Sequence, residues 1–201
     1  MAGLRERKTA ATRQRILDEA NRLFERDGFD AVTLAEIAEA ADVSLKTVVN
    51  YSGAKEDLFF DAERPGIDDL LVAIAGRHER SLSLTEAVRP LLVDGPVLAG
   101  TTTWASIDET TWSALRRCAE CERDSPTLTA RRAALLQSWL VHLAERSGSA
   151  PWSAMLTGVL VLRHSIVLDG LVAGRSPAGV ARLVRTAVGG ALDALERGFA
   201  R

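Results

Sequence analysis

Cysteine is scarce in this chain, which has only two among its 201 residues. Cys118 and Cys121 stand one helical turn apart with no second pair, so the sequence has no disulfide scaffold of the kind that holds small secreted domains together. The N-terminal residues carry charges but lack the apolar stretch of a signal peptide. Together these features favour a cytoplasmic protein.

Long hydrophobic runs are also missing. The longest candidate, Met155 to Leu162, is interrupted by Thr157 and followed by Arg163 and His164. Because a helix that spans a bilayer needs about 20 consecutive apolar residues, we interpret this segment as a buried helix and expect no membrane partner.

Enzyme motifs are absent as well. The sequence contains no glycine loop that could cradle a phosphate, no G-x-S-x-G and no H-E-x-x-H. Cys118, Cys121, His142 and His164 offer the ligand types of a tetrahedral zinc site, but zinc sites usually place a C-x-x-C pair in a turn, and both histidines fall on other predicted helices. We favour two small thiols that are buried or half-buried, and we expect no catalytic residue, no metal site and no cofactor.

What the chain does contain is helical periodicity. Apolar residues make up 47% of the sequence and charged residues 26%, which suits a soluble protein with a core, and the net charge of −2 does not by itself indicate nucleic-acid binding. Apolar residues recur at helical spacing through most of the chain, and we find no strand pattern and no internal repeat. We therefore predict an all-α fold, with a first helix that begins near residue 9, after residues 1–8.

Basic residues gather at the N-terminus. Residues 1–15 contain one acidic residue, Glu6, and five basic ones: Arg5, Arg7, Lys8, Arg13 and Arg15. This basic arm is suited to attraction by the phosphates of a nucleic acid.

The stretch from Thr33 to Leu58 carries the most specific local pattern. Thr33 and Glu36 fit a T-x-x-E capping box, which predicts a helix that begins at the next residue, 34. Asp42-Val43-Ser44 predicts a tight turn, because Asp tolerates a left-handed backbone and Ser44 is a good N-cap. Two short helices joined by this turn make a helix-turn-helix.

The second helix of this motif, Leu45 to about Tyr51, has a polar exposed side. Val48 is its clear core anchor, and its hydrogen-bonding residues are Lys46, Thr47, Asn50 and Tyr51. Such a side is typical of a recognition helix in the major groove of DNA. Behind it, the N–H groups at the start of a fourth helix and the ammonium of Lys55 predict a phosphate site.

The string V-S-x-x-T-V-x-x-Y-x-x-x-K-E-D-L, here Val43 to Leu58, resembles the DNA-binding head of the TetR family of transcriptional regulators. The agreement extends back to Ala20 and covers the first quarter to third of the chain. The family often has an aromatic residue where Val49 stands and Phe where Ser52 stands.

The resemblance implies an N-terminal three-helix helix-turn-helix DNA-binding head on a larger helical ligand-binding and dimerisation body. We place the DNA-binding domain at residues 1–62 and the body at residues 63–201. Pro65-Gly66 should break or kink the fourth helix, and we interpret Glu63–Gly66 as the joint between head and body, with a plain loop between two helices as the alternative. The residues expected to contact DNA are Thr33, Ser44, Leu45, Lys46, Thr47, Val49, Asn50, Tyr51 and Lys55.

The last two predicted helices favour a homodimer. Residues 152–173 are apolar nearly all round, and residues 177–199 have a wide apolar stripe with small residues at Gly190 and Ala191. A helix that is apolar on every side must be covered on every side, and a two-fold four-helix interface would cover it. A monomer with both helices central in its own core is the alternative.

The body also has the residue types of a small-molecule site. Large aromatics with sparse polar groups suit a ligand pocket, although a single tryptophan is more often a core filler. The candidate ligand-binding residues are Trp104, Trp112, Trp139, His142 and His164.

The sequence thus favours a homodimeric repressor that a small apolar ligand releases from a palindromic operator in double-stranded DNA. The alternative is an all-α small-molecule-binding or enzymatic protein with a degenerate DNA-binding head, for which Val49 and Ser52 speak.

Overall fold

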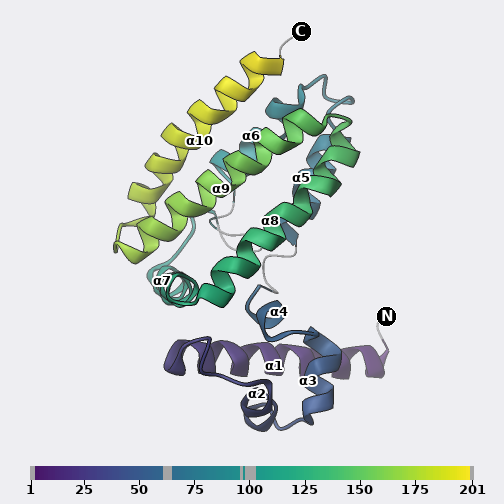
Figure 1. Ribbon diagram of the computed structural model, residues 1–201, viewed down its shortest axis with the longest axis vertical. Helices are drawn as coiled ribbons and strands as arrows, with labels where there is room; N and C mark the ends of the chain where they lie inside the picture. The colour runs from purple at the N-terminus through teal and green to yellow at the C-terminus, as the bar shows by residue number, and fades with distance from the viewer. Residues whose placement is uncertain (1–2, 61–64, 96, 98–102, 200–201) are drawn as a thin grey trace. The chain divides into compact units, whose positions relative to one another are not determined.

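The computed structural model describes residues 3–60, 65–95, 97 and 103–199, and within these ranges the regular elements are ten α-helices without a β-strand (Figure 1). In chain order they are α1 (Leu4–Asp27), α2 (Leu34–Ala40), α3 (Leu45–Ser52), α4 (Lys55–Phe59), α5 (Pro65–Ala75), α6 (Leu84–Val93), α7 (Glu109–Asp124), α8 (Pro126–Ser147), α9 (Ala150–Val172) and α10 (Pro177–Phe199). The predicted all-α fold is confirmed.

The chain divides into two compact units. The first, which we call the head, contains α1 to α4 together with Cys121–Thr129, the corner at which α7 ends and α8 begins. The second, the body, contains α5, α6, α9, α10 and the remainder of α7 and α8. The boundary that we predicted at residue 62 leaves out Cys121–Thr129, which belongs to the head.

The head has its own hydrophobic core. Ile16, Ala20 and Phe24 bury one face of α1 at helical spacing. The ring centroids of Phe24 and Phe29 are 5.0 Å apart, and those of Phe29 and Phe59 are 5.9 Å apart. Aromatic rings in such pairs contribute to stability beyond the area they bury, so this cluster ties α1, the loop after it and α4 together.

The first helix is longer than the sequence suggested. It begins at Leu4, and the backbone N–H of Gly3 donates to the carboxylate of Glu6 over 2.8 Å. The expectation that residues 1–8 precede the helix is therefore wrong, because this acidic residue in the first turn satisfies a donor of the helix start. Arg7 and Lys8 of the basic arm lie on exposed positions of α1.

The body is a helical bundle in which α9 and α10 lie side by side, α6 packs on α10, and α5 packs on α6 (Figure 1). At Gly170 the two long helices meet closely, since a Cβ atom there would lie 2.5 Å from Cγ2 of Val180. The indole N–H groups find acceptors across the core: Trp112 donates to the carbonyl of Arg175 over 3.0 Å, and Trp152 to the hydroxyl of Thr85 over 3.1 Å.

The joint predicted at Glu63–Gly66 falls largely outside the described residues, which omit 61–64. The proline and glycine of this segment begin α5 instead of breaking a helix, because proline suits the first position of a helix. That helix ends at Ala75.

Candidate nucleic-acid interface

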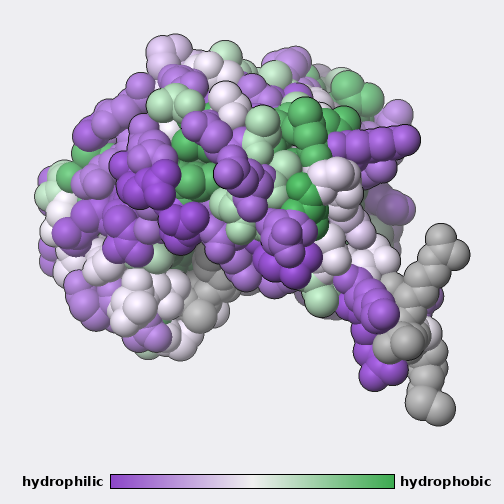
Figure 2. Space-filling view, turned by 90° about the horizontal axis from the view of Figure 1, so that it is seen from below, coloured by the Kyte–Doolittle hydropathy of each residue, from purple (hydrophilic) through white to green (hydrophobic). Residues whose placement is uncertain are grey.

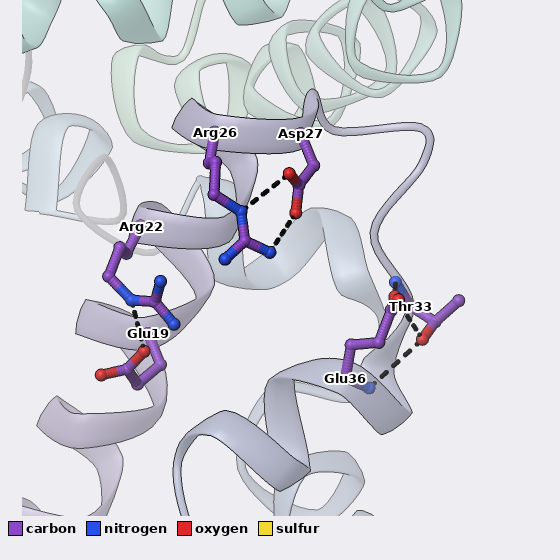
Figure 3. A network of polar contacts seen from close by, with 6 residues as sticks. All are labelled: Glu19, Arg22, Arg26, Asp27, Thr33 and Glu36. Carbon is purple, nitrogen blue, oxygen red and sulfur yellow. Dashed lines mark hydrogen bonds and ion pairs between the residues drawn. The ribbon is translucent and has the colours of Figure 1, made fainter.

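The first helix of the motif begins with the predicted capping box (Figure 3). The N–H of Glu36 donates to the hydroxyl of Thr33 over 3.2 Å, and the N–H of Thr33 donates to the carboxylate of Glu36 over 2.8 Å. These hydrogen bonds from Thr33, first the backbone one and then the one from its hydroxyl, lower the pKa of Glu36. The box fixes the start of α2 without help from the rest of the head.

The turn between α2 and α3 has the predicted backbone. Asp42 has a φ of 51°, in the left-handed region that aspartate tolerates. The N–H of Val43 donates to the carbonyl of Ala38 over 3.0 Å, which closes the turn. Ser44 then caps α3, since its hydroxyl accepts from the N–H of Thr47 over 3.1 Å.

Only one side of α3 is buried in the head. Val48 and Ser52 face the core, and the hydroxyl of Ser52 donates to the carbonyl of Val48 over 3.1 Å. Ser52 is therefore a satisfied polar residue at a position where the family often has Phe, and it leaves no unpaired hydroxyl in the core.

The other candidates on α3 differ in exposure. Leu45, Lys46, Val49 and Asn50 are exposed, whereas Thr47 and Tyr51 are half-buried.

Three of the predicted contact residues have hydroxyls that already make local hydrogen bonds. The hydroxyl of Thr33 takes part in the capping box, and those of Ser44 and Thr47 lie 2.8 Å apart and form a hydrogen bond with each other. A hydroxyl can accept and donate at once, so these groups can still approach a phosphate. The freest hydrogen-bonding side chains of α3 are those of Lys46 and Asn50.

Lys55 lies at the start of α4, and its ammonium turns toward the loop that follows α1. It donates to the carbonyls of Phe29 and Val32, each over 2.8 Å, and lies 4.2 Å from the centroid of the Phe29 ring. An ammonium has three N–H donors, so one is left for the predicted phosphate contact. The N–H of Ala54 donates to the carboxylate of Asp57 over 3.3 Å, so a residue of α4 itself satisfies this donor at the start of the helix.

The corner Cys121–Thr129 completes the head, and the sequence pattern did not reveal this. Leu128 is fully buried in the head core, and the hydroxyl of Ser125 donates to the carboxylate of Asp30 over 2.9 Å. Cys121 is half-buried, its sulfur lies 3.9 Å from the carbonyl oxygen of Phe24, and burial raises the pKa of its thiol. A thiol held in its protonated form is a poor metal ligand and nucleophile.

The described part of the chain does not bring together the ligands of the zinc site considered from the sequence. No group of three or more His, Cys, Asp or Glu residues that could hold a metal ion is found there. Cys118 and Cys121 are both half-buried.

The candidate ligand residues of the body are distributed unevenly. Trp104 and Trp112 are buried in the body core, Trp139 and His164 are half-buried, and His142 is exposed on α8. The indole N–H of Trp104 is buried without an acceptor among the described residues. The sequence gives aromatic residue type but not which indole lacks an acceptor.

Arg163 is a buried cation of the body. Its guanidinium donates to the carbonyls of Leu92 and Val97 over 2.8 Å and 3.1 Å, and burial lowers its pKa to about 10.

A capped helix-turn-helix whose second helix exposes Lys46 and Asn50 is typical of a DNA-binding domain. Residues 16–62 match the family described as bacterial regulatory proteins, tetR family. The head of the chain is thus similar to the DNA-binding domain of this family, as the sequence pattern indicated.

One curated relative and two solved structures are similar to the chain. The chain is 38% identical over 56 residues to the HTH-type transcriptional regulator TcmR of Streptomyces glaucescens, a match that covers 28% of this chain and only 25% of the relative. Native NalD, described as the secondary repressor of the MexAB-OprM multidrug efflux pump in Pseudomonas aeruginosa, superposes with a TM-score of 0.56 at 18% identity, over 90% of this chain and 96% of NalD. The multidrug binding protein EbrR, complexed with imidazole, gives a TM-score of 0.43 at 21% identity, over 87% and 93%. The likeness to NalD shows that the fold is shared along nearly the whole chain.

Proposed function

We propose that the protein is a homodimeric transcriptional repressor that binds a palindromic operator and leaves it when a small apolar ligand binds in the body. The exposed pair Lys46 and Asn50 on α3 carries the proposal. Both side chains stand on one face, a helical turn apart, and suit hydrogen bonds to base edges: lysine to guanine and asparagine to adenine.

The exposed apolar surface of α9 supports the dimer. This helix is strongly apolar, yet only 39% of its most apolar stretch is buried in one copy of the chain. By length and composition such a helix could also cross a membrane, as core helices of soluble proteins could. Met155, Val161 and Leu162 are exposed on α9, as are Leu183 and Gly190 on α10. A second copy that presents the same two helices would cover this surface.

The tryptophan-rich core of the body supports the proposal that a small ligand binds there. The lone indole N–H of Trp104 would be satisfied by a ligand with a hydrogen-bond acceptor, since leaving a buried donor unmade costs free energy. Trp112 already has an acceptor in Arg175 and would contribute its ring face.

The corner Cys121–Thr129 offers a route from ligand to DNA. The helices that meet there, α7 and α8, continue along the chain into the body, while Leu128 and Ser125 lie in the head. A ligand that shifts either helix would therefore act on the packing around Asp30 and Phe24. Such coupling requires that the ligand bind the two arrangements with different affinity.

Selection of DNA from a random duplex pool tests the proposal. The wild-type protein is expected to enrich an inverted repeat whose half-sites lie about one helical turn apart or a multiple of it, because two identical heads read two half-sites. Enrichment of a single unrepeated site would contradict the dimer. No enrichment at low salt would contradict DNA binding and leave the alternative of a small-molecule-binding protein with a degenerate head. The same regulator would act in the cytoplasm, where bacterial operators are.

A further inference from the structure

Leu45 and Val49 form an exposed apolar pair on α3. Their side chains are 48% and 43% exposed, whereas Val48 beside them is fully buried. Among the head residues whose side chains the structure describes, these two are the exposed large hydrophobics, and the others lie in the body. Their spacing of four residues places them on one face of the helix.

This apolar pair runs directly beside the polar pair Lys46 and Asn50. Each polar residue follows an apolar one in the chain, so the two stripes are about 100° apart around the helix axis. The apolar stripe is therefore continuous with the surface that the proposed function places in the major groove. Neither Leu45 nor Val49 has a group that could hydrogen-bond to a base edge or a phosphate.

The major groove offers one apolar feature to such side chains, the 5-methyl group of thymine. We propose that Leu45 and Val49 contact thymine methyl groups in each half-site and thereby select T·A pairs next to the bases that Lys46 and Asn50 contact. This inference rests on the proposed DNA-binding function. It assigns the position held by Val49, where the family often has an aromatic residue, to base selection.

The size of the effect follows from the methyl group alone. Burial of one such group is worth ~0.8 kcal/mol, which corresponds to about fourfold in affinity. Replacement of thymine by deoxyuridine removes only this methyl and keeps every hydrogen-bonding atom of the pair.

A deoxyuridine scan of a duplex enriched by the wild-type protein tests the inference. Each thymine of both half-sites is replaced in turn, and affinity is measured by fluorescence anisotropy at one fixed salt concentration. We expect about a fourfold loss at one or two thymines of each half-site. Val49→Ala or Leu45→Ala should abolish that sensitivity at its own thymine, while Lys46→Ala, as the matched control, should bind more weakly but retain it.

The outcomes separate this inference from the function on which it rests. If duplexes are enriched but no thymine methyl affects affinity, or the enriched half-sites contain no thymine, the DNA-binding function stands and the assignment of Leu45 and Val49 is wrong. If Val49→Ala weakens all duplexes equally and keeps the methyl sensitivity, Val49 contacts the backbone instead. If no duplex is bound at all, both proposals fall together.

Discussion

The ammonium of Lys55 donates to the backbone carbonyl of Phe29 over 2.8 Å and lies 4.2 Å from the centroid of the ring of the same residue. With a second bond to the carbonyl of Val32, the lysine joins the start of α4 to the loop between α1 and α2. The side chain of Lys55 thus joins the same elements as the aromatic cluster of Phe24, Phe29 and Phe59.

Replacement of Lys55 should therefore lower the stability of the head. Hydrogen bonds from a charged group are the stronger ones, at about 1.5 kcal/mol or more each, and Lys55→Met removes two of them, so we expect a loss of about 3 kcal/mol in the free energy of unfolding. Urea denaturation followed by circular dichroism measures this loss. Lys46→Met removes the same charge from an exposed site on α3 and should leave stability unchanged.

The salt dependence of DNA binding tests whether Lys55 also contacts a phosphate, in addition to its hydrogen bonds to the carbonyls of Phe29 and Val32. A phosphate contact predicts that the salt slope falls by about one unit in Lys55→Met, with all sequences weakened equally. A variant as stable as wild type would show that the carbonyl contacts do not hold the motif.

Two leucines on α8 test whether the corner Cys121–Thr129 belongs to the head. Leu128 and Leu143 are both fully buried, the first in the head core and the second in the body core. Truncation of a buried leucine to alanine costs about 2–5 kcal/mol. In hydrogen exchange, Leu128→Ala should expose the amides of α1 to α3, whereas Leu143→Ala should expose those of the body helices. The same pattern in both variants would contradict the division into these units.

The local features of the motif could be predicted, and the distant ones could not. Capping by Thr33 and the left-handed turn at Asp42 depend on neighbours within four residues, so sequence spacing reveals them. Ser125 and Asp30 meet although they are 95 residues apart, and no periodicity in the chain signals this contact. For Lys55, the residue type and its position at a helix start predicted a phosphate contact. The fold instead places two backbone carbonyls within hydrogen-bond distance of its ammonium.

Gly190 gives a cleaner test of the dimer than the neighbouring Ala191. It is exposed, and a Cβ atom there would meet nothing within 4 Å. Gly190→Glu should thus leave the protomer folded while it buries a charge and its two-fold copy in the interface, which opposes association. Sedimentation should show a dimer for the wild type and a monomer for the variant, and Ala191→Glu should act in the same direction.

The control for Gly190→Glu is a substitution at Gly170, where an added side chain would meet residues of the same protomer. Gly170→Ala forces a Cβ atom to within 2.5 Å of Cγ2 of Val180, and overpacking of this kind costs about 1–3 kcal/mol. It should destabilise each chain without changing the stoichiometry. A wild type that is monomeric at micromolar concentration, or a dimeric Gly190→Glu, would place the interface elsewhere.

The capping box makes the start of α2 sensitive to acid. Hydrogen bonds from Thr33 lower the pKa of Glu36 below its ordinary value of 4.5. A group with a depressed folded pKa stabilises the folded state above its unfolded pKa, and the contribution is lost as the pH falls through the folded pKa. Thr33→Ala removes the hydroxyl donor and keeps the backbone N–H, so NMR titration of the Glu36 carboxyl carbon should give a lower midpoint in the wild type than in this variant. Equal midpoints would contradict the hydrogen bond from the Thr33 hydroxyl.

The most direct test of the central claim is the affinity of the wild type, Lys46→Ala and Asn50→Ala for a selected duplex and for its shuffled counterpart. A good base contact is worth about 1–3 kcal/mol. Each variant should therefore lose that much binding free energy on the selected duplex and almost none on the shuffled duplex, so that its sequence preference shrinks. Arg182→Ala, which removes a charge from an exposed site on α10, should behave as wild type. If both variants keep the affinity and the sequence preference of the wild type, then α3 does not lie in the major groove and the account is wrong.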